Sequence, residues 1–318
     1  MKILRFNPLL KQTIWGGDKI AQMKHIADAP DLVGESWELS AVPGDETVCL
    51  GEESLTLTEL VARYREKLVG LHVYEQFGDT FPLLIKFIDA RQNLSIQVHP
   101  DDETARRQGK TRGKTEMWYL LESAPDAFLY CGLKEAITPG QYQQMVEDDT
   151  ICDALARYPV SEGDVFFIPA GRIHAIGAGC LLAEIQQTSD VTYRIYDYKR
   201  RDKNGNLRQL HTREALESID FSVYPDYRSH YTPKKDQGVE IVTCPYFTTS
   251  LYDVSGSSVT IEQHRLDSFI ILMGLSGEVS VAADGDSTTL HGFETLLVPA
   301  ENSKLTITGK GRLLEVHI

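Results

Sequence analysis

The sequence lacks the features that mark membrane and secreted proteins. No apolar run approaches the ~20 residues that a helix needs to cross a bilayer. The first residues, MKILRFNPLLKQTIWGG, carry lysines and polar side chains where a signal peptide needs an unbroken apolar stretch. We therefore expect a cytoplasmic protein that has no membrane partner.

Cysteine and positive charge are also in short supply. The five cysteines are scattered, odd in number and never spaced as C-x-x-C, which argues against a disulfide framework or a cysteine zinc site. The 32 Lys and Arg residues face 46 Asp and Glu residues, so the formal net charge is −14. This excess of negative charge argues against nucleic acid as a partner. In such an acidic chain, a local cluster of positive charge is a stronger indication of a binding site for a negatively charged group.

What the sequence does contain is ordinary globular composition and many short strand-like runs. The chain has 318 residues with 42% hydrophobic side chains, a length at which a single core usually gives way to two lobes. Runs such as FPLLIKFIDA, CLLAEIQQ and SFIILMGLSGEVSV are short, apolar or alternating, and are separated by Gly, Pro and Asp. The helices that we expect are 54–76, capped by Ser54 or Thr56; 138–158, capped by Thr138 with a proline in the first helical position; and 213–219.

An internal repeat indicates two related small barrels in tandem. SEGDVFFIPAGRIHAIGAGCLLAEI is similar to LHGFETLLVPAENSKLTITGKGRLLEVHI, with Pro169 aligned to Pro299. The polar stretch 225–238 is the expected boundary between the two units. Many short strands with turn signals are typical of barrels and sandwiches.

The two copies of the repeat differ in their polar residues. The alignment sets His174 opposite Lys304, and it sets Glu116 roughly opposite Ser268. Potential metal ligands therefore occur in the first copy, so that a metal site is expected in the first barrel.

Four residues of the first copy form a candidate ligand set. Because side chains alternate along a strand, Ser95, Gln97 and His99 in NLSIQVHPDD share one polar face. Glu116 opens a second predicted strand, and His174 follows a turn. An amide oxygen, two imidazole nitrogens and a carboxylate suit zinc with water or substrate as a further ligand. Nickel, iron or manganese use similar groups.

Several motifs together resemble one enzyme family. QVHPDD, GKTEMWY, IPAGRIHAIGAG and EIQQTSDVTYRIYDYKR, with WGG and GESWELS nearer the N-terminus, resemble the short bacterial form of type I mannose-6-phosphate isomerases over essentially the whole chain. The resemblance implies a mainly β fold of two tandem cupin-type (jelly-roll) β-barrels with a small helical insertion. It also implies one zinc ion per chain. With the boundary expected in the polar stretch, we predict a catalytic domain at 1–228, which includes the helical segments 54–76 and 138–158, and a metal-free cupin domain at 229–318.

The same resemblance implies an activity and a set of site residues. The activity is the interconversion of mannose 6-phosphate and fructose 6-phosphate through a cis-enediol. The zinc ligands of the family fall on the four residues proposed above. The active-site arginine falls on Arg194, two acidic residues fall on Glu184 and Asp190, and a basic residue falls on Arg200, with Lys199 beside it.

These residues cover the chemistry that an aldose–ketose isomerisation needs. Arg194 is a permanent cation suited to an enediolate. The base is open between Glu184, Asp190, His99 and a metal-bound water, and burial of Glu184 in an apolar strand would raise its pKa. The expected phosphate ligands are Ser95, Lys114, Lys199 and Arg200.

Other functions stay open at this stage. Two histidines and one carboxylate also suit an Fe(II)-dependent cupin dioxygenase. A non-catalytic sugar-binding bicupin and an isomerase that acts on another aldose phosphate or on a free sugar are further alternatives. We expect a small phosphosugar as the partner, and a monomer or a weak homodimer.

Overall fold

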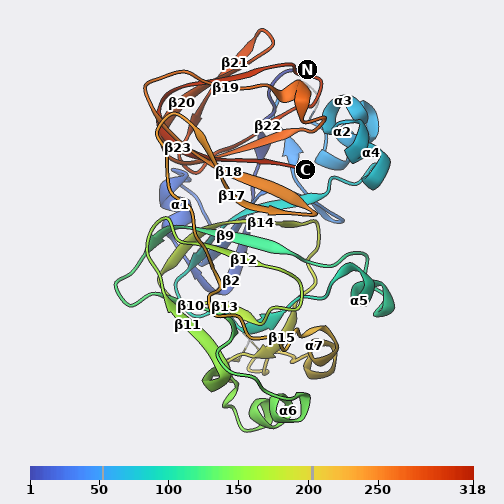
Figure 1. Ribbon diagram of the computed structural model, residues 1–318, viewed down its shortest axis with the longest axis vertical. Coiled ribbons are helices and arrows are strands. Elements are labelled where there is room, and N and C mark those ends of the chain that lie inside the picture. The colour runs from blue at the N-terminus through green and yellow to red at the C-terminus, as the bar shows by residue number, and fades with distance from the viewer. Residues whose placement is uncertain (52–53, 202–203) are drawn as a thin grey trace.

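The computed structural model describes residues 1–51, 54–201 and 204–318 and confirms a mainly β protein. Figure 1 shows two stacked lobes, with β9 and β14 near the middle of the stack and the C-terminal strands above them. No helix in the described part of the chain has the length and apolar character to cross a membrane.

The N-terminal lobe contains two sheets. One sheet has seven strands in the order β16-β12-β9-β14-β7-β2-β3, and the other has five in the order β11-β10-β13-β8-β15. Their strands are β2 (Leu9–Gly17), β3 (Val33–Leu39), β7 (Leu83–Ala90), β8 (Ile96–Val98), β9 (Glu116–Ser123), β10 (Phe128–Leu133), β11 (Leu155–Pro159), β12 (Val165–Ile168), β13 (His174–Ile176), β14 (Cys180–Gln187), β15 (Tyr193–Tyr196) and β16 (Arg228–Ser229). Two short pairs join β1 (Phe6–Asn7) to β6 (Val48–Cys49) and β4 (Ala41–Val42) to β5 (Asp45–Glu46).

The C-terminal lobe is a further seven-stranded sheet. Its main path is β17-β18-β23-β20-β21, while β19 pairs with β23 and β22 pairs with β20. Its strands are β17 (Gly238–Cys244), β18 (Phe247–Ser255), β19 (Val259–Ile261), β20 (Ile270–Ala283), β21 (Asp286–His291), β22 (Thr295–Val298) and β23 (Leu305–His317). The start of the chain also joins this lobe, because Leu4 and Leu297 exchange backbone hydrogen bonds of 2.8 and 3.0 Å.

The central strands of the molecule are buried on both faces. On β14, Leu182 packs between the two sheets of the N-terminal lobe, whereas Leu181 and Ile185 belong to a core that includes Val316 of β23. A strand covered on both sides reads as a nearly continuous apolar run, which is how CLLAEIQQ appears in the sequence. The C-terminal lobe therefore covers the outer face of the sheet whose inner face carries Glu184.

The predicted helix 54–76 is three short helices: α2 (Leu57–Tyr64), α3 (Glu66–Val69) and α4 (Leu71–Phe77). Thr56, rather than Ser54, caps α2, in a capping box with Glu59. The chain breaks at Arg65 and Gly70, where φ is 47° and 95°. Gly70 is needed there because a Cβ atom would lie 1.9 Å from the backbone oxygen of Asp267.

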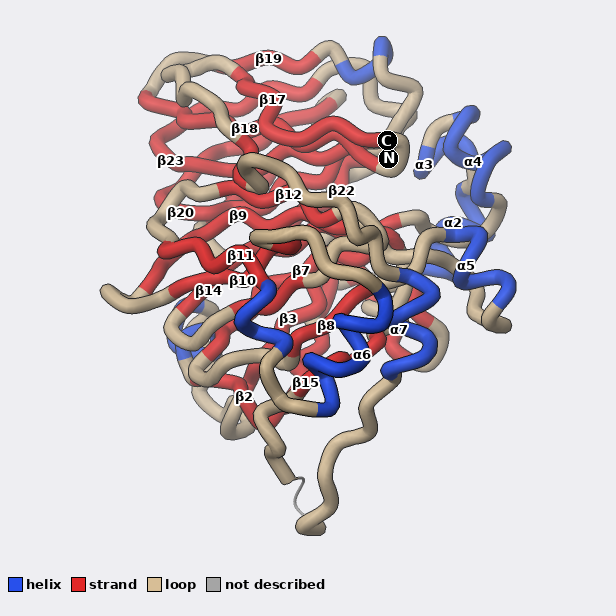
Figure 2. Tube along the Cα trace, turned by 60° about the horizontal axis from the view of Figure 1, so that its bottom comes forward, coloured by secondary structure: helices blue, strands red, loops and turns tan. Residues whose placement is uncertain are grey.

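The predicted helix 138–158 is too long. Thr138 caps α6 (Pro139–Glu147) as expected, but Asp149 has a φ of 60°, and after a 3-10 turn η1 (Ile151–Ala154) the chain continues as β11. The prediction failed because LARYP pairs with β10, a tertiary contact that outweighs local helix preference. Figure 2 shows α6 and α7 (Thr212–Ser218) near β8 and β15 of the five-stranded sheet. The remaining short helices are α1 (Lys19–Met23), α5 (Asp102–Arg107) and η2 (Gln263–Arg265).

Strand register corrects one position of the repeat. Ile168 precedes Pro169 and pairs with Glu116, whereas Val298 precedes Pro299 and pairs with Ile270. The counterpart of Glu116 is therefore Ile270, two residues beyond Ser268. An alignment of the two copies that is anchored only on the Pro-Ala turn cannot detect this shift of two positions in the preceding strand.

The close approach of Gly70 to the C-terminal lobe yields a stability prediction. Replacement of Gly70 by Ala should lower the free energy of unfolding by about 3 kcal/mol, because it combines a backbone conformation reserved for glycine with overlap of the Asp267 carbonyl. The control is Gly78→Ala, where φ is 59° but no atom lies within 4 Å of the added Cβ. That variant should lose only about 1 kcal/mol. Urea denaturation followed by circular dichroism measures both, and equal losses would contradict the explanation.

Candidate metal centre and active-site cavity

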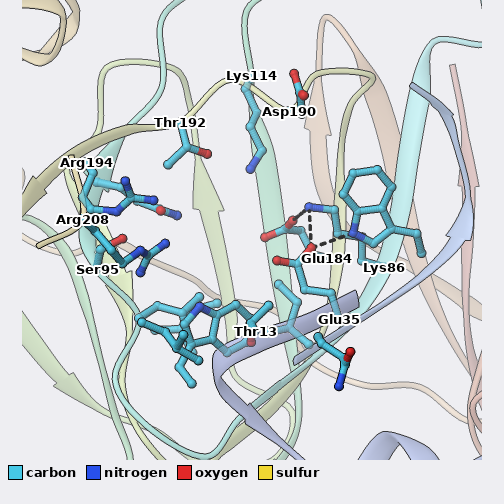
Figure 3. A pocket seen from close by; sticks show the side chains of 18 residues that line it. Thr13, Glu35, Lys86, Ser95, Lys114, Glu184, Asp190, Thr192, Arg194 and Arg208 are labelled. Atoms are coloured by element: carbon cyan, nitrogen blue, oxygen red, sulfur yellow. Dashed lines mark hydrogen bonds and ion pairs between the residues drawn. The ribbon is translucent and has the colours of Figure 1, made fainter. Parts of the chain in front are cut away.

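A cavity of about 530 Å³ opens beside β8, between the two sheets of the N-terminal lobe. Charged side chains line it from opposite sides, and two tryptophans add an aromatic surface (Figure 3). The charged and aromatic lining residues are Trp15, Glu35, Trp37, Lys86, Lys114, Glu184, Asp190, Arg194 and Arg208. Ser95 and Gln97 also line it, as the alternation along NLSIQVHP predicted.

The structure brings the four predicted metal ligands together. Ligand atoms of His99, Glu116 and His174 all lie within 4.8 Å of one another. Glu116 Oε2 is 3.5 Å from His99 Nε2, and Glu116 Oε1 is 3.3 Å from His174 Nε2. Gln97 completes the set, since its amide Nε2 lies 3.2 Å from His174 Nε2. In a tetrahedral site with bonds of about 2.0–2.1 Å, ligand atoms are separated by about 3.3 Å.

The orientation of both histidines is set by backbone carbonyls. His99 Nδ1 donates to the Val191 carbonyl and His174 Nδ1 donates to the Arg172 carbonyl, each at 2.8 Å. Each ring therefore turns an unprotonated Nε2 toward Glu116, as in metal-binding histidines whose other nitrogen is held by a carbonyl.

Buried polar atoms without partners show that these residues fit a cation. Among the described residues, His99 Nε2 and both carboxylate oxygens of Glu116 are buried and have no hydrogen-bond partner of good geometry. Unpaired buried acceptors are costly, and three of them facing one another repel. A divalent ion would satisfy all of them, and a half-turn of the Gln97 amide would add its oxygen.

The protonation of the cluster agrees with this fit. Burial, followed by the charge of Lys114, lowers the pKa of His99 well below its usual value. Burial also lowers the pKa of His174, to about 3. Both imidazoles are therefore neutral at physiological pH, which is the form that binds metals. Burial raises the pKa of Glu116 even though Lys114 Nζ lies 3.1 Å from its Oε2, so the carboxylate lacks sufficient positive charge.

The structure corrects the expected behaviour of Glu184. Burial by itself would raise the pKa of Glu184, but the charges of Lys86 and Lys114 outweigh burial and lower the pKa. Lys86 Nζ lies 3.1 Å from Glu184 Oε1 and 3.3 Å from Glu35 Oε2. Trp118 Nε1 donates to the other oxygen of Glu184 at 2.8 Å. Sequence reasoning missed the cation because Lys86 stands in an apolar strand, and its register opposite Glu184 is a tertiary fact.

Arg194 and Asp190 both line the cavity, at different depths. Arg194 pairs with Gln97 in the strand register of β15 and β8, and its Nη1 donates to the Gln209 carbonyl at 2.9 Å. Burial, followed by the nearby charge of Arg208, lowers the pKa of Arg194. Asp190 is exposed. Arg194 and Arg208 put two guanidinium groups on the same side of the cavity, where they attract negatively charged groups of a ligand.

Two of the predicted phosphate ligands do not line the cavity. Lys199 is exposed, with 68% of its side chain accessible, and it forms an ion pair with Asp149. Arg200 is held by the carboxylate of Asp197 and by the carbonyl of Asn93. Arg208 lines the cavity instead, 3.3 Å from Asp197.

Sequence reasoning missed Arg208 because it lies beyond the end of the motif EIQQTSDVTYRIYDYKR, which contains Lys199 and Arg200. Arg208 follows Leu207, which forms an isolated β-bridge with Arg201, and no periodic signal in the sequence marks its place at the cavity. Trp15, Glu35 and Trp37 were also missed as site residues, although the WGG and GESWELS motifs that contain them had been noticed.

The fold and the site define a two-lobed β protein with a candidate metal centre beside a polar cavity. The model for "Phosphomannose isomerase type I, catalytic domain" matches residues 3–127, and that for "Mannose-6-phosphate isomerase, cupin domain" matches residues 239–318. Mannose-6-phosphate isomerase ManA of Bacillus subtilis (strain 168) is 36% identical, over 99% of this chain and 98% of the relative. Mannose-6-phosphate isomerase of Streptococcus mutans is 31% identical, over 97% and 96%. The chain belongs to the type I phosphomannose isomerase family.

Solved structures confirm the predicted cupin fold. The mannose 6-phosphate isomerase from Bacillus subtilis matches with a TM-score of 0.86 and 29% identity, over 100% of both chains. A mutant phosphomannose isomerase from Salmonella typhimurium matches with a TM-score of 0.81 over 100% of this chain and 99% of that one. At 16% identity, the second match bears on the fold only.

The ligand geometry predicts one divalent cation per chain. Glu116→Gln removes the charge of the cluster and should weaken zinc binding more than about 100-fold, since loss of a group that merely supports a ligand already costs about 10- to 100-fold. Glu122→Gln is the control on the same strand, because Glu122 pairs with Lys19 instead. Equilibrium dialysis with elemental analysis measures the affinity. Similar zinc affinities in the two variants would exclude Glu116 as a ligand.

Proposed function

We propose that the protein interconverts D-mannose 6-phosphate and D-fructose 6-phosphate through a cis-enediol, with one zinc ion per chain. The observation that carries the proposal is the cavity, which lies beside the candidate ligand set and is lined by cations able to hold both an enediolate and a phosphate. The family of the chain supports the choice of substrate. A coupled assay with mannose 6-phosphate, before and after chelation, tests it. Activity that is unaffected by complete metal removal would contradict the zinc dependence.

Gln97, His99, Glu116 and His174 would hold the ion. When bound, zinc would polarise the oxygens on C1 and C2 of the open-chain sugar. Lys114 lines the same part of the cavity, since its ammonium is 3.1 Å from Glu116. We therefore assign Lys114, which was predicted from the sequence as a phosphate ligand, to a sugar oxygen near the reacting carbons instead, where its charge offsets a developing negative charge.

Proton transfer between C1 and C2 is assigned to Glu184. The carboxylate faces the cavity and is positioned by Trp118 and Lys86. The lowered pKa keeps Glu184 ionised, so the carboxylate can accept a proton, but it also makes Glu184 a weaker base; the assignment rests on its position facing the cavity. Lys86 balances the buried charge before the proton arrives. Asp190, at the exposed rim, is assigned to sugar hydroxyls.

The opposite end of the cavity is assigned to the phosphate. Ser95 immediately precedes β8 and lines the cavity together with Gln97, and residues two apart in extended chain lie about 7 Å apart. Ser95 therefore stands one step away from the metal ligands, and Arg208 lies on the same side of the cavity (Figure 3). Arg208 replaces Lys199 and Arg200 in this assignment, because those two do not line the cavity. Arg194, next to Gln97 in the register, lies within reach of an enediolate oxygen.

The role of Arg194 gives a kinetic prediction. Arg194→Ala should keep zinc bound but lower kcat about 10²- to 10³-fold, because a fixed positive charge is lost where negative charge develops. Arg213→Ala is the control, since Arg213 is 88% exposed and pairs with Glu217 one turn further along the same helix. Steady-state kinetics with metal analysis of each sample provide the measurement. A near-native kcat in Arg194→Ala would refute the role.

The phosphate assignment is tested by a pair of variants. Arg208→Ala should raise KM for mannose 6-phosphate about 10- to 100-fold, the loss expected for charge-assisted hydrogen bonds. Lys199→Ala should leave KM unchanged, because its ammonium pairs with Asp149 outside the cavity. Inhibition by inorganic phosphate, measured for both variants, checks that the lost contact is to the phosphate. The opposite order of effects would restore Lys199 as the phosphate ligand.

A further inference from the structure

The C-terminal lobe contacts the metal-bearing segments through a hairpin turn. β17 and β18 are joined at the turn that contains Tyr246, because Cys244 pairs with Phe247. Tyr246 is half-buried and packs against the core shared by the two lobes. Its hydroxyl donates to Oδ2 of Asp102 at 3.1 Å. Asp102 is the first residue of α5 and follows His99 by only three positions.

The other oxygen of Asp102 holds a second segment. Asp102 Oδ1 accepts a hydrogen bond of 2.8 Å from the backbone of Gly113 and one of 3.2 Å from Gln187 Nε2. Gln187 Oε1 in turn accepts the backbone N–H of Thr115 at 2.8 Å. The residues on both sides of Lys114 are therefore fixed, directly or through one amide, by a single carboxylate.

The two segments are also in tight backbone contact. A Cβ atom on Gly113 would lie 2.5 Å from the carbonyl carbon of Asp101, which leaves no room for a side chain. The Lys114 N–H donates to the Pro100 carbonyl at 3.0 Å. Residues 113–116 and 99–102 are consequently locked together, and these segments carry the ligands Glu116 and His99.

We propose that Tyr246 is a positioning residue for the metal site, acting through Asp102. By orienting this carboxylate, Tyr246 holds the segments of His99 and Glu116 at the separation at which their ligand atoms share one ion. Burial, followed by the charge of Asp102, raises the pKa of Tyr246 to about 12, so the hydroxyl stays protonated and remains a donor. The identity of the ion rests on the proposed function. The second lobe then contributes to the site without supplying a ligand.

Zinc affinity of the full-length chain tests the inference, with Tyr231→Phe as the matched control for Tyr246→Phe. Tyr231 is also half-buried against the shared core, but its hydroxyl donates to the Gly163 carbonyl at 2.8 Å, away from Asp102. Competition with a chromophoric chelator should show zinc binding weakened about tenfold in Tyr246→Phe, the lower range for a supporting residue. Tyr231→Phe should stay within about twofold of the wild type at a similar loss of thermal stability.

Kinetics and a double-mutant cycle separate positioning from general destabilisation. Tyr246→Phe should lose kcat at limiting zinc and recover it at excess zinc, with KM for mannose 6-phosphate unchanged. Asp102→Asn should weaken zinc binding on its own, and adding Tyr246→Phe should weaken it no further. Additive effects, or equal zinc affinities in the two tyrosine variants, would overturn the inference. If the wild type binds zinc but has no isomerase activity, the proposed function alone is contradicted. If the wild type binds no zinc, both the proposed function and the role of Tyr246 are overturned.

Discussion

Two imidazole nitrogens and a carboxylate face one another inside the N-terminal lobe, and the rest of the structure is arranged around this group of acceptors. In a buried environment such an arrangement is unfavourable unless a cation lies between them. The surrounding chain keeps it in place by fixing the far side of each group. The carbonyls of Val191 and Arg172 orient the two rings, and Lys114 supplies partial compensation beside Glu116. The ligands come from both sheets of the lobe, so the cluster exists only when the sheets are packed.

The layered architecture explains why the site needs a second lobe. Inner faces of β7, β9 and β14 carry Lys86, Glu116 and Glu184, while their outer faces carry apolar residues such as Phe87 and Met117. Those outer residues pack against the C-terminal lobe, where Phe87 and Phe293 have ring centroids 5.2 Å apart. Burial on both faces holds the strands rigid, and rigid strands keep charged groups at the distances that catalysis requires.

Local patterns predicted the parts of the site that lie on single strands. The alternation of NLSIQVHP placed Ser95 and Gln97 on the polar face, and the Thr138 cap was found because its partner is three residues away. Predictions failed where a distant segment intervenes. The helix prediction at 138–158 overran because its last part pairs with β10, and the pKa of Glu184 was misjudged because Lys86 belongs to the neighbouring strand.

By itself, the sequence determined the mainly β class, the tandem repeat, the family and the residues able to bind a metal, because these depend on residue type and short-range periodicity. Only the tertiary structure decided which cations line the cavity, since Arg208 lines it while Lys199 pairs with Asp149 outside it. It also decided the register that sets Glu116 against Ile168, and the contact of Tyr246 with Asp102. Contacts between segments far apart in the chain depend on how the sheets and lobes pack. A local pattern of side chains does not specify which distant segments meet.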